Sequence, residues 1–304
     1  MATRGATSAG ALDNPLTRIA AEIDQLFSDL LRPPADPSAR LVDAMRFASI
    51  GGGKRLRPLL VCASADLFGV QRSHSIRAGL AVECVHVHSL VHDDLPCMDD
   101  DDLRRAKPTV HVAYDEATAV LAGDSLLALA FDILGDDATH PDPALRCELV
   151  TELARAAGAY GMAGGQMLDL LPAGAAKADI EAITRLQRLK TGALIGWSVD
   201  AGAILGGAPD EARVSLRGYA QNLGLAFQIA DDLMDRCGDE TKAGKRLRKD
   251  AGQGKQNFVT LLGEARARRQ ARLLVDQAID HLHPFGAAAE LLAEIARFTV
   301  NREK

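Results

Sequence analysis

The amino-acid sequence predicts an all-α protein, a single-domain bundle of roughly ten or more helices. Apolar residues make up 47% of the 304 residues but aromatic residues only 4%. Ala and Leu, the strongest apolar helix formers, dominate instead. Apolar residues also recur every three or four positions, as along residues 267–282, which is typical of amphipathic helices. No segment shows a convincing strand-like alternation, and the length suits one large domain with a substantial core.

Proline, glycine and other loop-forming residues divide this helical pattern. Residues 1–13 are expected to form a flexible tail, and residues 14–304 a single domain. The interruptions fall, in chain order, at residues 32–38, 51–53, near 96, at 136–143, 172–174, 206–209, 238–254 and 284–286. Roughly ten helices fit between these breaks. A bundle of this kind places functional side chains in its core, on helices that face one another.

Charge, cysteine usage and hydropathy exclude several classes of protein. The net charge of −6 gives no general attraction to nucleic acid or to anionic membranes. Five scattered cysteines without a CxxC pair argue against a disulfide framework, so we expect a reducing, cytoplasmic location. The first 17 residues lack the apolar segment of a secretory signal. The most apolar stretch, residues 120–134, carries Asp124 and Asp132, so no membrane span is expected.

A dense acidic segment follows the strongly apolar helix predicted at residues 78–91. It places six aspartates within ten residues, namely Asp93, Asp94, Asp99, Asp100, Asp101 and Asp102. A solvated acidic turn is the ordinary explanation for such a run. Here the run begins where a core helix ends, and its repulsion calls for a cation. Mg²⁺ binds through a few carboxylates together with substrate phosphate oxygens. Because Pro96 cannot continue a helix, we expect the chain to bulge there and return Asp99 to the side of Asp93.

A second acidic group follows another apolar helical stretch, residues 223–229. Asp231 and Asp235 are four residues apart, so they share one face of a helix about 6 Å apart, and Asp232 flanks them. Like charges at this spacing destabilise an isolated helix. A bound cation again accounts for the arrangement most simply.

Several basic segments are candidates for binding phosphate. Residues 51–57 form a glycine turn followed by Lys54, Arg55 and Arg57, and these cations are suitable donors to a phosphate. The spacing is not that of a Walker A loop. A solvated basic turn explains this segment about equally well. The other basic candidates are Arg104, Arg105, Lys190, Lys245 and Lys255.

The histidines before the first acidic segment raise the alternative of a transition metal. His86, His88 and His92 lie on the same predicted helix, and His88 and His92 have a ligand spacing of four residues. The adjacent carboxylates favour a hard cation over zinc. The sequence therefore combines acidic groups for magnesium with basic groups for a diphosphate.

These residues resemble those of the trans-isoprenyl diphosphate synthases, and in particular the bacterial short-chain farnesyl diphosphate synthases. The similarity extends over about residues 40–265. The matching segments are GGGKRLRPLL, AVECVHVHSLVHDDLPCMDDDDLRR, KPTVH, AVLAGDSLL, GGQMLDL, LKTGALI, GLAFQIADDLMD and GKRLRKDAGQGK. Two aspartate-rich motifs in this order, with the basic and KTG segments between and around them, make the resemblance specific.

The resemblance implies an isoprenoid synthase fold with the active site in a central cavity between helices, a homodimer, and a role for each matching residue. The expected ligands of Mg²⁺, three ions per active site with Mn²⁺ as a substitute, are Asp93, Asp94, Asp99, Asp231, Asp232 and Asp235. The expected allylic-diphosphate contacts are Arg104, Lys190, Thr191, Gln228, Lys245 and Lys255. The expected isopentenyl-diphosphate pocket contains Lys54, Arg57, His86 and Arg105. The six aspartates and Lys190 are the expected catalytic residues.

The implied reaction begins with ionisation of an allylic diphosphate, dimethylallyl or geranyl. Metal ions and preorganised cations stabilise the charge on the departing diphosphate. The isopentenyl double bond then attacks the allylic cation, and a proton is lost. No protein nucleophile is needed for this chemistry, and the family's usual proton acceptor is the released diphosphate.

Two features depart from the family pattern. Gln256 and Asn257 replace a common Ser/Ala-Thr pair, and residues 246–248 make the preceding loop more basic. His88 occupies the position five residues before the first motif, which in this family helps to set product length. About 7.5 Å of helix separate it from Asp93. Because His is smaller than the Tyr of farnesyl-type enzymes but larger than Ala, we expect a C15 product, with C20 as the alternative.

Three other functions would account for part of this pattern. A regulatory subunit of the family would typically have lost one aspartate motif, and both are present. A terpene cyclase would not need the second basic pocket. A simple acidic cation-binding module would need neither Lys54 and Arg57 nor the KTG segment.

Overall fold

The computed structural model describes residues 9–171, 179–237 and 256–301, and most of them are helical. The first half contains α1 (Ala9–Leu30), α2 (Ala39–Ser49), α3 (Leu56–Asp66), α4 (Arg72–Asp93), α5 (Val110–Ala113), α6 (Glu116–Gly135), α7 (Pro143–Ala157) and α8 (Met162–Asp169). The second half contains α9 (Ile180–Gln187), the π-helix η1 (Arg188–Gly192), α10 (Ala193–Leu205), α11 (Asp210–Cys237), α14 (Phe258–Leu262), α15 (Glu264–Asp280), the 3-10 helix η2 (His283–Ala289) and α16 (Glu290–Val300). The predicted all-α bundle is confirmed.

The one sheet among the described residues is a short hairpin. Strands β1 (Leu103–Arg104) and β2 (Lys107–Pro108) pair antiparallel, with Arg104 opposite Lys107. The sequence pattern did not predict this hairpin, because two residues per strand are too few to show an alternation. The expected flexible tail, residues 1–13, overlaps the first helix, because α1 begins at Ala9.

Several helix boundaries coincide with the expected breaks, at residues 32–38, 51–53, 136–143 and 206–209, and polar caps and a proline mark some of the helix starts. The expected breaks at 172–174 and 238–254 lie outside the described residues. Asp115, Asp142 and Asp179 each accept a hydrogen bond from the first turn of α6, α7 and α9, respectively. Pro143 occupies the first turn of α7, where its missing N–H costs nothing. These caps satisfy backbone donors that a helix start would otherwise leave without partners.

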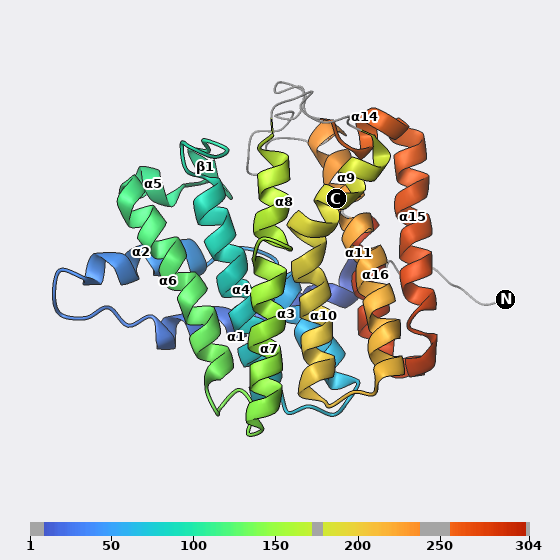
Figure 1. Ribbon diagram of the computed structural model, residues 1–304, viewed down its shortest axis with the longest axis horizontal. Helices are drawn as coiled ribbons and strands as arrows, with labels where there is room; N and C mark the ends of the chain where they lie inside the picture. The colour runs from blue at the N-terminus through green and yellow to red at the C-terminus, as the bar shows by residue number, and fades with distance from the viewer. Residues whose placement is uncertain (1–8, 172–178, 238–255, 302–304) are drawn as a thin grey trace.

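The core lies along the apolar helices in the middle of the bundle. α10 packs against α3, α7 and α11, and α4 packs against α3 and α6. Nearly all of α10 and residues 58–65 of α3 are buried. Figure 1 shows α4, α7 and α10 running from the bottom to the top of the view, with the β1–β2 hairpin, α9 and α14 at the top. α4 and α11 both end there, which brings the two acidic segments to the same end of the bundle.

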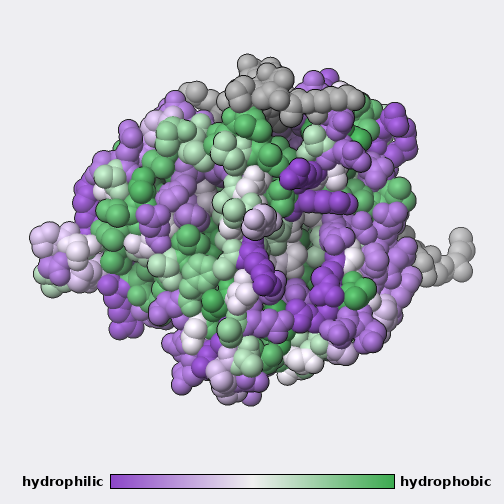
Figure 2. Space-filling view, viewed as in Figure 1, coloured by the Kyte–Doolittle hydropathy of each residue, from purple (hydrophilic) through white to green (hydrophobic). Residues whose placement is uncertain are grey.

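α6 is the one described helix that is long and apolar enough to cross a membrane by length and composition. Within the structure it packs against α2, α4 and α7, and 39% of its most apolar window is buried. The remainder of that helix contributes to a surface rich in apolar side chains, which Figure 2 shows in green over α6 and α8.

Candidate functional site

The first acidic segment bends back on itself immediately after α4. The amide of Asp99 donates to the carbonyl of Asp93 at 2.9 Å, and the amide of Asp101 donates to that of Asp94 at 3.2 Å. Pro96 lies between them, where the helix has ended. The predicted return of Asp99 to the side of Asp93 is therefore confirmed at the level of the backbone.

Asp93 lies in an environment that disfavours its charge. Burial raises the pKa of its carboxyl to about 6; the Lys190 ammonium opposes this rise, and the Asp99 carboxylate adds to it. A carboxyl whose pKa is raised by burial and by a neighbouring carboxylate is a frequent sign of a functional site. The influence of Lys190 also shows that η1 approaches the end of α4.

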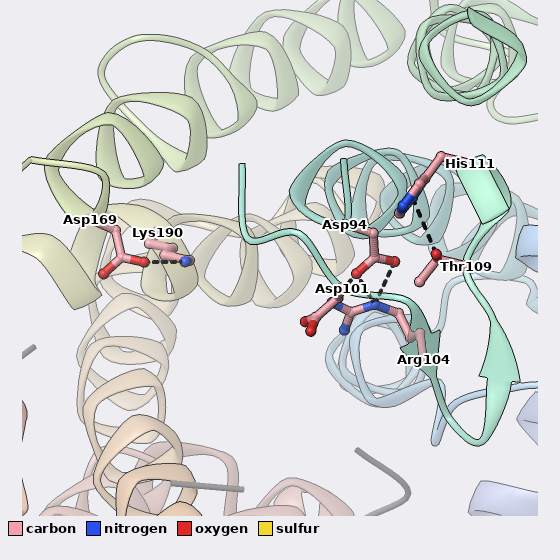
Figure 3. Close-up of polar contacts among 7 residues, drawn as sticks. All are labelled: Asp94, Asp101, Arg104, Thr109, His111, Asp169 and Lys190. Atoms are coloured by element: carbon pink, nitrogen blue, oxygen red, sulfur yellow. Dashed lines mark hydrogen bonds and ion pairs between the residues drawn. The ribbon is translucent and has the colours of Figure 1, made fainter. Parts of the chain in front are cut away.

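Asp94 and Arg104 bind each other. Nε of Arg104 donates to both carboxylate oxygens at 2.9 Å, and its Nη2 lies 2.6 Å from Oδ1 (Figure 3). Burial raises the pKa of the Asp94 carboxyl, and the hydrogen bonds from Arg104 oppose that rise. This forked pair fixes the Arg104 guanidinium at the start of the hairpin. Asp94, which the sequence suggests as a metal ligand, has both oxygens bonded to an arginine in this structure.

Lys190 lies on η1 and forms an ion pair with Asp169 at the end of α8, at 2.7 Å. Figure 3 shows this pair on elements facing those of the Asp94–Arg104 pair. Asp169 is not among the site residues predicted from the sequence, although it lies within the matching segment GGQMLDL. Its position three residues after Gln166, which places both on one face of α8, was the available signal.

The second acidic group connects to η1 through a chain of hydrogen bonds. The Thr191 hydroxyl donates to Oε1 of Gln228 at 3.2 Å, and Nε2 of Gln228 donates to Oδ1 of Asp232 at 2.9 Å. The other oxygen of Asp232 accepts the amide of Phe258 at 2.9 Å. Asp232 is thus buried and bonded to protein donors, whereas Asp231 and Asp235 are half-buried on α11.

Asn257 has a structural role that explains one departure from the family pattern. It caps α14, accepting the amide of Thr260 at 2.9 Å, while the Thr260 hydroxyl accepts the Asn257 amide at 2.9 Å. This reciprocal pair is a capping box. It places the amide of Phe258 against Asp232.

The basic segment at residues 51–57 divides into accessible and buried cations. Lys54 is exposed, with its Nζ 5.1 Å from the ring centre of Phe298, and Arg57 is half-buried. Arg55 is completely buried and forms ion pairs within the protein. The sequence pattern of three cations in four residues does not reveal this division.

Arg105 and His86 lie with this basic segment. A Cβ on Gly53 would approach Nη2 of Arg105 to 2.6 Å, so the glycine allows the guanidinium to pack on the turn. Burial lowers the pKa of His86 well below its usual range, and Arg57 and Arg105 lower it further. Three of the four residues predicted for the basic pocket therefore lie near one another, with a neutral imidazole beside Arg57 and Arg105. The ammonium of the fourth, Lys54, lies over the Phe298 ring.

His88 faces α6 from the interior of α4. Its Nδ1 lies 3.0 Å from the carbonyl oxygen of Gly123, and its ring centre lies 4.5 Å from that of His92. Burial lowers the pKa of His88 to about 4, and His92 lowers it further. His92 in turn lies 3.1 Å from the carbonyl oxygen of Val120.

Lys245, Lys255 and residues 246–248 lie outside the described residues.

The acidic residues suit a hard dication. Carboxylates are the ligands Mg²⁺ prefers, and this ion completes its octahedron with water and substrate phosphate. Within the described part of the chain, no three His, Cys, Asp or Glu side chains are already grouped as a closed metal site. The Asp99 carboxylate contributes to the raised pKa of Asp93, and a bound cation would offset the repulsion between these two carboxylates. The residues present therefore fit magnesium shared with a phosphate ligand.

Comparison with known proteins gives consistent matches. The model of the polyprenyl synthetase family matches residues 39–292. The chain is 42% identical to the farnesyl diphosphate synthase of Escherichia coli, covering 93% of this chain and 96% of that protein. It is 38% identical to the geranylgeranyl diphosphate synthase of Cyanophora paradoxa, covering 86% and 87%. The crystal structure of an FPP/GFPP synthase from Zymomonas mobilis superposes with a TM-score of 0.88 at 51% identity, covering 97% of this chain and all of that one. The chain belongs to the polyprenyl synthetase family.

Proposed function

We propose that this protein is a trans-prenyltransferase that condenses isopentenyl diphosphate with dimethylallyl or geranyl diphosphate to give farnesyl diphosphate. One observation carries the proposal. Two neighbouring residues of η1 interact with both acidic groups. Lys190 lowers the pKa of Asp93 in the first group, and Thr191 is hydrogen-bonded through Gln228 to Asp232 in the second. A single diphosphate at η1 would therefore lie between them.

Each group then has a defined task. Asp93, Asp99, Asp231 and Asp235 would hold magnesium, which when bound offsets the charge of the departing diphosphate. Arg104 and Lys190 would donate to the same diphosphate, held in place by Asp94 and Asp169 respectively.

The separate basic group receives the second substrate. Lys54, Arg57 and Arg105 would bind isopentenyl diphosphate, with His86 as a neutral hydrogen-bonding partner. Holding the double bond beside the ionising carbon turns a bimolecular reaction into one between positioned groups. Two distinct anion sites distinguish this arrangement from that of a terpene cyclase, which needs one.

The C15 product is supported by the relatives and by His88. The relatives of 39–42% identity named farnesyl diphosphate synthase come from Escherichia coli, Bacillus subtilis and Geobacillus stearothermophilus. His88 is a half-buried ring anchored on α6, and it blocks more space than an alanine would. The geranylgeranyl product remains the second candidate, because synthases of that name match at 38–41% identity.

The test is direct. Purified protein with Mg²⁺, geranyl diphosphate and radiolabelled isopentenyl diphosphate should form farnesyl diphosphate, identified by chromatography after dephosphorylation. A C20 product would replace the C15 assignment. Absence of turnover with both dimethylallyl and geranyl primers would overturn the enzyme assignment itself.

We also propose a homodimer. Exposed apolar side chains occur on α6, on α8 and just after α8, where Val120, Leu121, Met167, Leu170 and Leu171 are 36–59% exposed. An apolar surface of this kind usually marks an interface. Figure 2 shows green patches over this part of the molecule, with polar residues between them.

A further inference from the structure

Arg55 is an unusual member of the basic segment because nothing of its side chain reaches solvent. Its Nη1 donates to Oε1 of Glu83 at 2.7 Å, and its Nη2 donates to Oδ1 of Asp24 at 2.7 Å. The same Nη2 also contacts the carbonyl oxygen of Ser49. A buried arginine with two carboxylate partners cannot itself bind a diphosphate, so its position between Lys54 and Arg57 needs another explanation.

Asp24 joins the two ends of the glycine turn. One of its oxygens binds Arg55, and the other accepts the amide of Gly51 at 3.0 Å. Gly51, Gly53 and Arg55 all have positive φ, at 77°, 87° and 49°. For Arg55 this left-handed conformation is intrinsically unfavourable, and the buried ion pairs hold it there. The side chain of Asp24 therefore fixes the shape of the whole turn from α1.

Glu83 connects the turn to the other half of the basic pocket. It is buried on α4, three residues before His86, so both lie on the same face of that helix. Glu83 and Arg55 are both close enough to Arg105 to affect its protonation electrostatically. The network thus touches the turn that carries Lys54 and Arg57, and lies beside His86 and Arg105.

We propose that Asp24 and Glu83, acting through Arg55, are positioning residues for the second diphosphate site. They hold the accessible cations of the turn in the arrangement that binds isopentenyl diphosphate. The network has one cation and two carboxylates, so it also offsets part of the repulsion among the neighbouring arginines. This inference rests on the proposed function of the basic pocket.

The decisive variant is Asp24→Asn, which keeps the shape of the side chain and removes its charge. We expect KM for isopentenyl diphosphate to rise about tenfold, the size expected for one charge-assisted hydrogen bond. KM for geranyl diphosphate should change less than twofold. Asp29→Asn is the matched control, because Asp29 lies on the same helix and is exposed, and its contacts are an ion pair with Arg32 at 3.8 Å and a surface hydrogen bond from Gln25 at 3.1 Å. It should leave both KM values unchanged.

Stability is measured alongside, because breaking a buried ion pair can unfold a protein. If Asp24→Asn proves unfolded, Arg55→Lys provides the same test, since it keeps the charge but loses the fork that joins Asp24 to Glu83. A folded variant whose two KM values change in parallel, or not at all, would overturn the proposal.

Calorimetric binding of isopentenyl diphosphate alone separates this inference from the function on which it rests. Wild-type protein that fails to bind this diphosphate would refute the proposed basic pocket. Wild-type and Asp24→Asn proteins that bind it equally well would refute the positioning role alone.

Discussion

Asp93 combines burial, a nearby cation and a neighbouring carboxylate at the end of α4. If it holds magnesium on the leaving diphosphate, Asp93→Ala should lower kcat at least a hundredfold, the usual scale for losing one preorganised electrostatic contact. Asp102→Ala is the control, because Asp102 is an exposed member of the same acidic segment. Steady-state kinetics with geranyl diphosphate measures both. Near-normal turnover of Asp93→Ala would contradict its assignment as a metal ligand.

His88 should also affect stability through its protonation. The pKa of its folded form is about 4, below the ordinary value of 6.5, so between these values the unfolded chain binds more protons. Stability from this group is therefore complete above pH 6.5 and is lost as the pH falls toward 4. Between pH 7 and pH 5 the loss is about 2 kcal/mol. His88→Gln should reduce by this amount the difference between unfolding free energies measured in urea at the two pH values. An unchanged difference would show that His88 is not buried as described.

The size of residue 88 should control the product. Its imidazole is anchored to the carbonyl of Gly123 and lies about 7.5 Å along the helix from Asp93. His88→Ala removes this ring, and we expect the main product to lengthen from C15 to C20. Chromatographic sizing of the dephosphorylated product measures this. A variant that still stops at C15 would place the floor of the tail site elsewhere.

At the scale of elements, the contact between α8 and η1 sets the position of Lys190. A Cβ on Gly165 would lie 2.1 Å from the amide nitrogen of Lys190, so the two backbones meet directly. Gly165→Ala should separate them, destabilise the protein by about 1–3 kcal/mol and lower kcat as the Lys190–Asp169 pair shifts. Gly196→Ala on α10 is the control, because a Cβ there meets nothing within 4 Å. Thermal unfolding and kinetics of both variants decide the matter, and a fully active Gly165→Ala protein would contradict the role of this contact.

The helices that carry the site could be predicted from the sequence because their signals are local. An apolar run before each acidic group places α4 and α11, and Pro96 explains the bend that returns Asp99 to Asp93. The helical repeat alone was enough to predict that Asp231 and Asp235 lie on one face of a helix.

The missed parts of the site depend on partners that are distant in sequence. Arg55 can be buried because it forms ion pairs with Asp24 on α1 and Glu83 on α4. A run of basic residues in the sequence does not indicate these distant partners. Asp169 acquires its partner Lys190 only when α8 packs on η1. Asp94 and Asp232 were grouped with the other aspartates, and the sequence does not show that Arg104 and the amide of Phe258 donate to them.

At the scale of the whole molecule, the composition predicted the all-α class but not the surface. α6 is apolar along most of its length, yet only 39% of its most apolar window is buried in the monomer. A bundle helix normally shows a polar stripe to solvent. The exposed face of α6 presents Val120 and Leu121 beside the exposed Asp124 and Asp132.

This surface should bury itself against a second copy of the chain. We expect the 32.3-kDa chain to sediment as a dimer, and Leu121→Glu, which places a charge in the interface, to shift it toward the monomer. Leu273→Glu is the matched control, because Leu273 on α15 is similarly exposed, at 49% against 54% for Leu121, but lies outside this surface. Analytical ultracentrifugation over a range of concentrations distinguishes the two variants. If Leu121→Glu remains dimeric while it is folded, the interface lies on another face, and the apolar side chains of α6 require a different partner.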